Sequence, residues 1–202
     1  MTSIESYKNP FDAIFDFERE LAKFTGAPYA ITTDRCTHAI ELCLRYLDFS
    51  DPVELTPYTY ISVPQTLHKL NIPYTYLNYE WEFEYQLWPA PVWDSARRLE
   101  PDMYRPGNFQ CLSFGRTKPL DIGIGGAILT DNEQAYEWLS RARYDGRDLR
   151  ISPWAEQKNF TVGYHYYMRP EECVIALDKL QRIEVFQHTD FSYPDCRTIT
   201  IE

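Results

Sequence analysis

The chain has 202 residues, and its 20 lysines and arginines against 30 aspartates and glutamates give a formal net charge of −10. A nucleic-acid-binding surface needs clustered cations, so this acidic sequence without a basic run predicts no nucleic-acid partner. No apolar stretch approaches the roughly 20 residues of a spanning helix, and the polar segment 1–10 does not resemble a signal peptide. We therefore expect a soluble, cytoplasmic protein with no membrane association.

Composition and cysteine usage favour an ordinary globular domain. Hydrophobic residues make up 44% of the chain and aromatic residues 16%, and a chain of this length buries roughly 70% of its unfolded surface. We expect one domain over 1–202. The 5 cysteines are odd in number and show no Cys-x-x-Cys spacing, so neither a disulfide framework nor a metal site is predicted.

The apolar pattern predicts alternating helices and strands. A first helix over 10–25 has helical spacing of apolar residues, Asn9 and Pro10 at its start and Gly26 at its end. The next elements, in order, are a strand (28–33), a helix (39–47), a strand (53–56), a helix through 67–70, strands (74–77, 91–93, 109–114, 126–129), a helix from 131 and a helix (170–183). This order predicts an α/β fold, a three-layer sandwich with a mostly parallel central sheet.

Two further segments have weaker patterns. Segment 80–85 alternates charged and aromatic residues, and a period of two is typical of an edge strand or an extended arm. Beyond His188 the tail is expected to form a weak strand or an ordered arm.

Ligands of parallel α/β sheets bind at the carboxyl ends of the strands, so we examined polar residues that follow strands. After the strand 28–33, Cys36 and Thr37 open a helix, whose free N–H groups and dipole favour a phosphate. After the strand 91–93 comes Asp94. A buried carboxylate needs a cationic partner or a capping role, and Arg97 or Arg98 could supply the cation.

Lys118 differs from the other lysines. It lies between two predicted strands among turn residues, whereas the others fall on helix surfaces, the polar terminus or a polar loop. A partly buried lysine suits Schiff-base chemistry. Together with Asp94 and the helix start it predicts a pyridoxal phosphate (PLP) site. The glycines of 123–126 precede a strand and so do not fit a dinucleotide-binding loop.

Six segments carry motifs in a shared order. They are 17–44 with Thr37, Pro57-Tyr58-Thr59-Tyr60, Trp93-Asp94-Ser95-Ala96, Ser113-Phe114-Gly115-Arg116-Thr117-Lys118, the run from Gly125 to Asp131, and Gly163-Tyr164-His165-Tyr166-Tyr167-Met168. In these segments the sequence resembles the DegT/StrS-type sugar aminotransferases, PLP enzymes of the aspartate aminotransferase fold (fold type I). The resemblance spans residues 11–185, with gaps.

The resemblance implies roles for individual residues. Lys118 would bind the cofactor covalently and move a proton between it and the substrate carbon. Asp94 would keep the pyridine nitrogen protonated, and Tyr60 would stack on the ring. Ser113 would help to hold the phosphate.

The amides of Cys36 and Thr37 would complete the phosphate site, which makes 27–150 the cofactor-binding core between an N-terminal helix (1–26) and a C-terminal helix and tail (151–202). His165 stands where the family has an asparagine that reaches across a dimer interface. The resemblance therefore implies a homodimer with shared active sites, and His165 as a contact to the neighbouring subunit's cofactor.

The sequence also departs from the family pattern. By this resemblance the family's strand–helix units between the strands 74–77 and 91–93, and its C-terminal domain after the helix 170–183, have no counterpart in this sequence, so we expect a reduced fold type I large domain. Arg97 stands where the family has Gln, His or Glu near the cofactor's 3-oxygen. Arg35 and Cys36 replace Ser-Gly, and Ile124 replaces a glutamate. These changes leave the sugar substrate open.

We therefore expect an aminotransferase that moves an amino group from a glutamate-like donor to a keto group, on a nucleotide-linked sugar. One alternative is an inactive or cofactor-binding-only protein that interacts through Trp81, Phe83 and Tyr85. The other is a different PLP reaction, such as dehydration.

Overall fold

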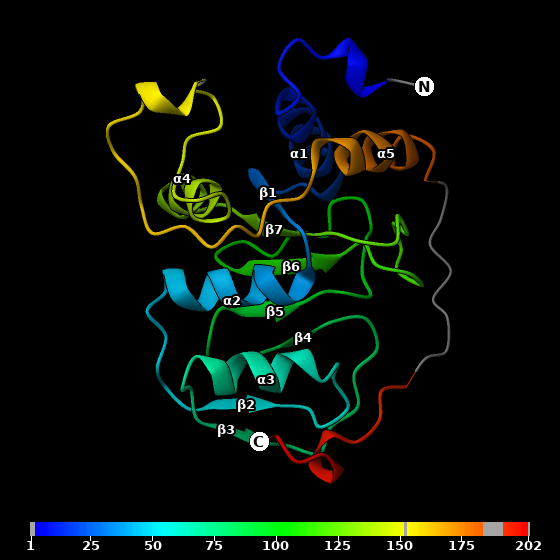
Figure 1. Cartoon of the computed structure of the whole chain (residues 1–202). Helices are drawn as coiled ribbons and strands as arrows, with labels where there is room; N and C mark the ends of the chain where they lie inside the picture. The colour runs from blue at the N-terminus through cyan, green and yellow to red at the C-terminus, as the bar shows by residue number, and fades with distance from the viewer. Residues whose placement is uncertain (1–2, 152, 184–191, 202) are drawn as a thin grey trace.

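The computed structural model describes residues 3–151, 153–183 and 192–201, and its helices lie around a central sheet (Figure 1). The helices are η1 (Ile4–Ser6), α1 (Asp12–Thr25), α2 (Cys36–Tyr46), α3 (Ser62–Lys69), α4 (Glu133–Ala142), η2 (Trp154–Glu156), α5 (Pro170–Leu180) and η3 (Cys196–Thr198). The strands are β1 (Tyr29–Thr33), β2 (Val53–Leu55), β3 (Tyr74–Tyr76), β4 (Tyr85–Gln86), β5 (Val92–Asp94), β6 (Phe109–Ser113) and β7 (Gly126–Thr130).

The central sheet is mixed, so the prediction of a mostly parallel sheet is wrong. Its 5 strands follow the order β1-β7-β6-β5-β4, and only β5 and β6 are parallel neighbours. The reason lies in the connection 114–125, which contains no helix. Parallel neighbours need a long crossover, usually helical, and without one β7 runs antiparallel to β6. Strands β2 and β3 form a separate parallel pair.

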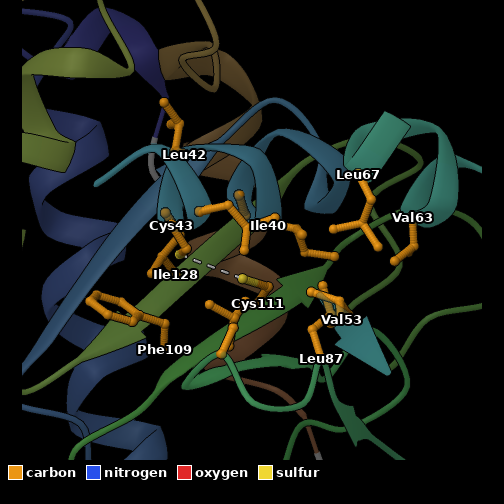
Figure 2. Close-up of a cluster of buried hydrophobic side chains, with 14 of the residues drawn as sticks. Ile40, Leu42, Cys43, Val53, Val63, Leu67, Leu87, Phe109, Cys111 and Ile128 are labelled. Carbon is orange, nitrogen blue, oxygen red and sulfur yellow. Dashed lines mark hydrogen bonds between the residues drawn. The ribbon is translucent and has the colours of Figure 1, made fainter. Parts of the chain in front are cut away.

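Helices cover both faces of the sheet. Successive side chains of β7 point to opposite faces, and apolar side chains on each face pack in a separate core. Ile128 packs on the face covered by α2 and α4, whereas Ala127 and Leu129 pack on the face covered by α1 and α5. Figure 2 shows the first core, where Ile40 and Cys43 of α2 lie against side chains of the sheet. This packing holds the start of α2 near the ends of the central strands.

Most predicted elements occur within a few residues of their expected bounds. Helix α1 buries Ile14, Phe17 and Leu21, and it ends at Gly26, whose φ of 74° is left-handed. Helix α5 is shorter than predicted, since it ends at Leu180.

The two weakly patterned segments form little regular structure. Of segment 80–85 only Tyr85 belongs to a strand, the edge strand β4. The described tail 192–201 has one turn of 3-10 helix and no strand, and the rest of the predicted arm, 189–191 and 202, lies outside the described residues. The division into 1–26, 27–150 and 151–202 stays a prediction. Among the described residues, no helix has the length and apolar character needed to cross a membrane.

Candidate active site

A cavity of about 300 Å³ lies where the strand ends meet the start of α2. Strands β5 and β6 are parallel, so their carboxyl ends share one edge of the sheet. Six residues singled out from the sequence line this cavity together: Cys36, Thr37, Tyr60, Asp94, Ser113 and Lys118. The remaining lining residues are Arg35, Ile40, Ser62, Val63, Ala96, Gly115, Arg116, Thr117 and Tyr193.

A tight turn after β6 presents Lys118 to the cavity. Its amide donates to the carbonyl of Gly115 at 3.3 Å. Thr117 has a φ of 67°, a left-handed conformation that is uncommon for a threonine and is found at functional turns. The Asp121 carboxylate accepts from the amides of Thr117 at 3.4 Å and Gly123 at 2.9 Å, which holds this turn.

Lys118 itself is a partly buried amine. Burial lowers its pKa, and the negative charge of the Asp94 carboxylate opposes that shift. Its Nζ donates to the Tyr193 Oη at 2.9 Å. A lysine with a lowered pKa carries a larger neutral, nucleophilic fraction than an exposed lysine at the same pH.

Asp94 is a buried carboxylate, 4% exposed, at the end of β5. Its Oδ1 accepts from the Ala96 amide at 3.0 Å, and its Oδ2 accepts from the Tyr85 hydroxyl at 3.0 Å. Burial raises its pKa, while these hydrogen bonds and the charge of Lys118 act in the opposite direction. Among the described residues, no cationic side chain lies within ion-pair distance of Asp94.

The N-terminus of α2 forms the opposite wall. Its N-cap residue Arg35 is extended, with φ −153°, and no side chain caps the helix. Unbonded N–H groups and the helix dipole make such an end favourable for an anion. The Thr37 hydroxyl lies 2.7 Å from the Ser62 hydroxyl on the rim of the same cavity.

A glycine brings this helix end against the sheet. A Cβ on Gly126 would lie 2.5 Å from the Cys36 amide nitrogen, 2.7 Å from the Arg35 carbonyl carbon and 2.8 Å from the Leu112 oxygen. All three are backbone atoms, which cannot move aside as a flexible side chain can. Glycine at this position therefore permits the close approach of α2 to β7.

The structure does not bring Arg97 and His165 to the Lys118 cavity. Arg97 lines a neighbouring cavity, with its guanidinium 5.8 Å from the Trp81 ring. The His165 side chain is 66% exposed, and its Nδ1 lies 2.9 Å from the Asp145 carboxylate. Their assignment to the cofactor stays a prediction.

Sequence reasoning missed two side chains of the site. Tyr85 supports Asp94 from the edge strand, and the alternation of segment 80–85 was a signal for an inward-facing residue there. Tyr193 reaches Lys118 from 75 residues away, and no local pattern could indicate that contact. Among the described residues, no group of three or more His, Cys, Asp or Glu side chains could hold a metal ion.

A comparison of the sequence with known protein families identifies one family. The family described as the DegT/DnrJ/EryC1/StrS aminotransferase family matches residues 5–82 and 105–190. The chain therefore belongs to this family, as the sequence motifs predicted.

Individual relatives are distant in sequence and similar in fold. An uncharacterized protein of Methanocaldococcus jannaschii, MJ1066, is 22% identical over 85% of this chain and 57% of its own length. AtS13 from Actinomadura melliaura has a TM-score of 0.72 at 18% identity, covering 85% of this chain and 60% of AtS13. Helicobacter pylori PseC, an aminotransferase involved in the biosynthesis of pseudoaminic acid, has a TM-score of 0.66 at 15% identity, covering 88% of this chain and 63% of PseC. The chain thus spans about three fifths of the length of these relatives.

Proposed function

We propose that this chain binds PLP in the Lys118 cavity and acts as an aminotransferase. The amino group would pass from a glutamate-like donor to a keto group on a nucleotide-linked sugar. One observation carries the proposal: a partly buried amine and a buried carboxylate, which form no ion pair with each other, face one cavity beside an uncapped helix end.

The residues around the cavity fit the cofactor that the family typically uses. A protonated ring nitrogen would supply the cation that Asp94 lacks among the described side chains. A phosphate would suit the amides of Cys36 and Thr37 at the start of α2, with the Ser113 hydroxyl beside them. The volume of about 300 Å³ is at the small end for a ligand pocket.

Each residue then has a definite task. When bound, PLP supplies an electron sink for the negative charge that develops on the substrate carbon. Lys118 would hold the cofactor through its Nζ and, when that nitrogen is free, would accept and return a proton there. Asp94 would hold a proton on the ring nitrogen. Tyr60, 56% exposed on the cavity wall, would cover the ring.

We also propose a homodimer in which His165 contacts the cofactor of the neighbouring subunit. The exposed imidazole is held in place by Asp145, and its ring lies 5.9 Å from that of Tyr144. Replacing His165 with Ala is expected to weaken PLP binding in a dimer. Sedimentation equilibrium and a PLP titration of the same samples test both parts.

An interaction protein without catalysis is less well supported. Two of its proposed contact residues already contact other parts of this chain. Tyr85 is 3% exposed, and the Trp81 Nε1 donates to the Tyr58 carbonyl at 2.7 Å. A nucleotide-linked keto sugar as acceptor draws on the likeness to PseC and stays the finer part of the proposal.

The test is a single turnover with stoichiometric PLP. Glutamate added to the loaded protein should yield about one equivalent of 2-oxoglutarate per bound cofactor, and the Lys118→Ala variant should yield none. Release of water from a keto-sugar nucleotide without consumption of glutamate would replace the aminotransferase with a dehydratase. Bound PLP that reacts with neither compound would support the non-catalytic alternative.

A further inference from the structure

Segment 192–201, which we call the strap, crosses beside the mouth of the Lys118 cavity. Its anchor is Cys196, 3% exposed. The Cys196 amide donates to the Pro57 carbonyl at 2.9 Å, and its thiol donates to the Thr59 carbonyl at 3.3 Å. The strap is thus fastened to the segment that also carries Tyr60.

The strap brings Tyr193 to the reactive lysine. The phenol oxygen accepts from the Lys118 Nζ at 2.9 Å. The ring is stacked on Trp81, with 6.1 Å between centroids and 16° between planes, and its centroid lies 6.0 Å from that of Tyr60. Tyr193 lines both the Lys118 cavity and the adjoining cavity of about 430 Å³. Tyr193 therefore lies between the two cavities as a lining residue that they share.

We propose that Tyr193 is a positioning residue, which holds the Lys118 amine by its phenol oxygen and shields it from water, so that the strap completes the site. This inference rests on the proposed function only in that Lys118 is taken as the reactive lysine. The contact belongs to this chain's own strap, outside the motifs matched to the family.

The pKa of Lys118 depends on the charged groups around it and on its hydrogen bond to Tyr193. Six other charged or titratable groups influence Lys118 or line its cavity: Asp94, Cys36, Tyr60, Arg97, Arg35 and Arg116. Burial also raises the pKa of Tyr193, so its phenol stays neutral across the physiological range. A neutral phenol oxygen can accept a hydrogen bond from the ammonium form of lysine, in place of the water that its ring excludes.

The two simplest substitutions should therefore act in opposite directions. Tyr193→Phe keeps the ring and removes the acceptor, so the ammonium form loses a partner and the pKa of Lys118 should fall by about one unit. Tyr193→Ala removes the ring and admits water, so the pKa should rise toward the ordinary lysine value. A ring that only fills space would leave the Phe variant unchanged.

The experiment is an NMR titration of the ligand-free protein labelled with 13C at the lysine Cε, with Lys118→Ala to assign the resonance. Tyr29→Phe is the matched control, since Tyr29 lines neither cavity and its ring stacks on Tyr136, far from the strap in the chain. Cys196→Glu places a charge at the buried anchor, and it should reproduce the rise seen with Tyr193→Ala while leaving Tyr193 intact. This variant tests the strap separately from the tyrosine.

A fall in the Phe variant together with a rise in the Ala and Glu variants supports the proposal. An unchanged Lys118 pKa in Tyr193→Phe, or a shift of the same sign in the Phe and Ala variants, overturns it. The titration needs no PLP, so it gives an answer even if the protein binds no cofactor. Conversely, loaded enzyme that transaminates while Tyr193→Phe leaves the pKa unchanged would retain the proposed function and reject the role of Tyr193.

Discussion

Two sets of oppositely charged side chains among the described residues, Glu18 with Arg143 and Asp94 with Lys118, differ in how they are satisfied. Glu18 of α1 and Arg143, which follows α4, form an ion pair with side chains 5% and 1% exposed. The Glu18 carboxylate also accepts from the amide and hydroxyl of Thr32, and Arg143 donates to the Thr32 carbonyl at 3.0 Å. The protein itself supplies both charges of this closed pair, which joins three elements of the fold, although the buried Arg143 Nε has no hydrogen-bond partner among the described residues.

Asp94 and Lys118 are arranged in the opposite way. They face a shared cavity without forming an ion pair, and burial shifts the pKa of each toward its neutral form. The closed pair offsets its desolvation with internal hydrogen bonds, whereas the open pair leaves part of that cost uncompensated until a ligand binds. The comparison shows that a buried charged side chain indicates a ligand-binding site only where the protein supplies no side chain of opposite charge to pair with it.

The largest expected effect at the open pair is on rate. In Asp94→Asn the loss of the buried charge that we propose pairs with the ring nitrogen should cost about 3–5 kcal/mol, roughly a thousandfold in turnover. Stability should move the other way. Because the folded-state pKa of Asp94 is raised, its ionised form destabilises the folded chain above the unfolded pKa of about 3.9. The ligand-free variant should therefore be slightly more stable at pH 7.

Steady-state rates and urea unfolding of the same preparation check this prediction. A turnover within a factor of a few of the unsubstituted chain would exclude the role of Asp94, whatever happens to stability.

At the closed pair the expected effect is on stability. Arg143→Met leaves Glu18 buried without its cation, which should lower the free energy of unfolding by about 3–5 kcal/mol. Adding Glu18→Gln removes the charge and keeps an acceptor for Thr32, so the double variant should recover part of the loss. Chemical denaturation measures both variants. A single variant as stable as the parent would contradict the assignment of Arg143 to the fold.

An intermediate effect, on stability and on PLP binding, is expected at the contact between the start of α2 and β7. Gly126→Ala forces a Cβ against backbone atoms at 2.5–2.8 Å, and relief by moving α2 should cost about 1–3 kcal/mol of stability and weaken PLP binding. Gly115→Ala is the matched control for the loss of stability alone, because its Cβ would meet only the Ser113 Oγ at 3.6 Å while Gly115 itself lines the Lys118 cavity. Equal losses in both variants would show that the close approach of α2 is unimportant.

The smallest effect is on the pH dependence of PLP attachment. The lysine must be neutral to attack, so the rate should rise about tenfold per pH unit below the Lys118 pKa and then level off. Because burial lowers that pKa from 10.5, the plateau should begin below the value for an ordinary lysine. Stopped-flow absorbance between pH 7 and 11 locates it. A rate still rising through pH 10.5 would mean that Lys118 is not shielded.

The sequence predicted the elements and six residues of the cavity, because apolar periodicity and strand-end position are local signals. It did not predict the direction of β7, since periodicity is the same for both directions. The helix-free connection 114–125 was the available clue. The Tyr193 contact with Lys118 and the closed pair of Glu18 and Arg143 depend on packing between distant segments, which spacing along the chain does not encode.

The most direct test of the account is an absorption titration of the purified chain with PLP, alongside Lys118→Ala and Lys158→Ala. Lys158 is exposed, so it controls for adducts at surface lysines. We expect a saturable absorption band, distinct from that of free PLP, in the parent and in Lys158→Ala, and its loss in Lys118→Ala. An identical band in all three proteins, or none in the parent, would contradict the assignment of the Lys118 cavity as the cofactor site.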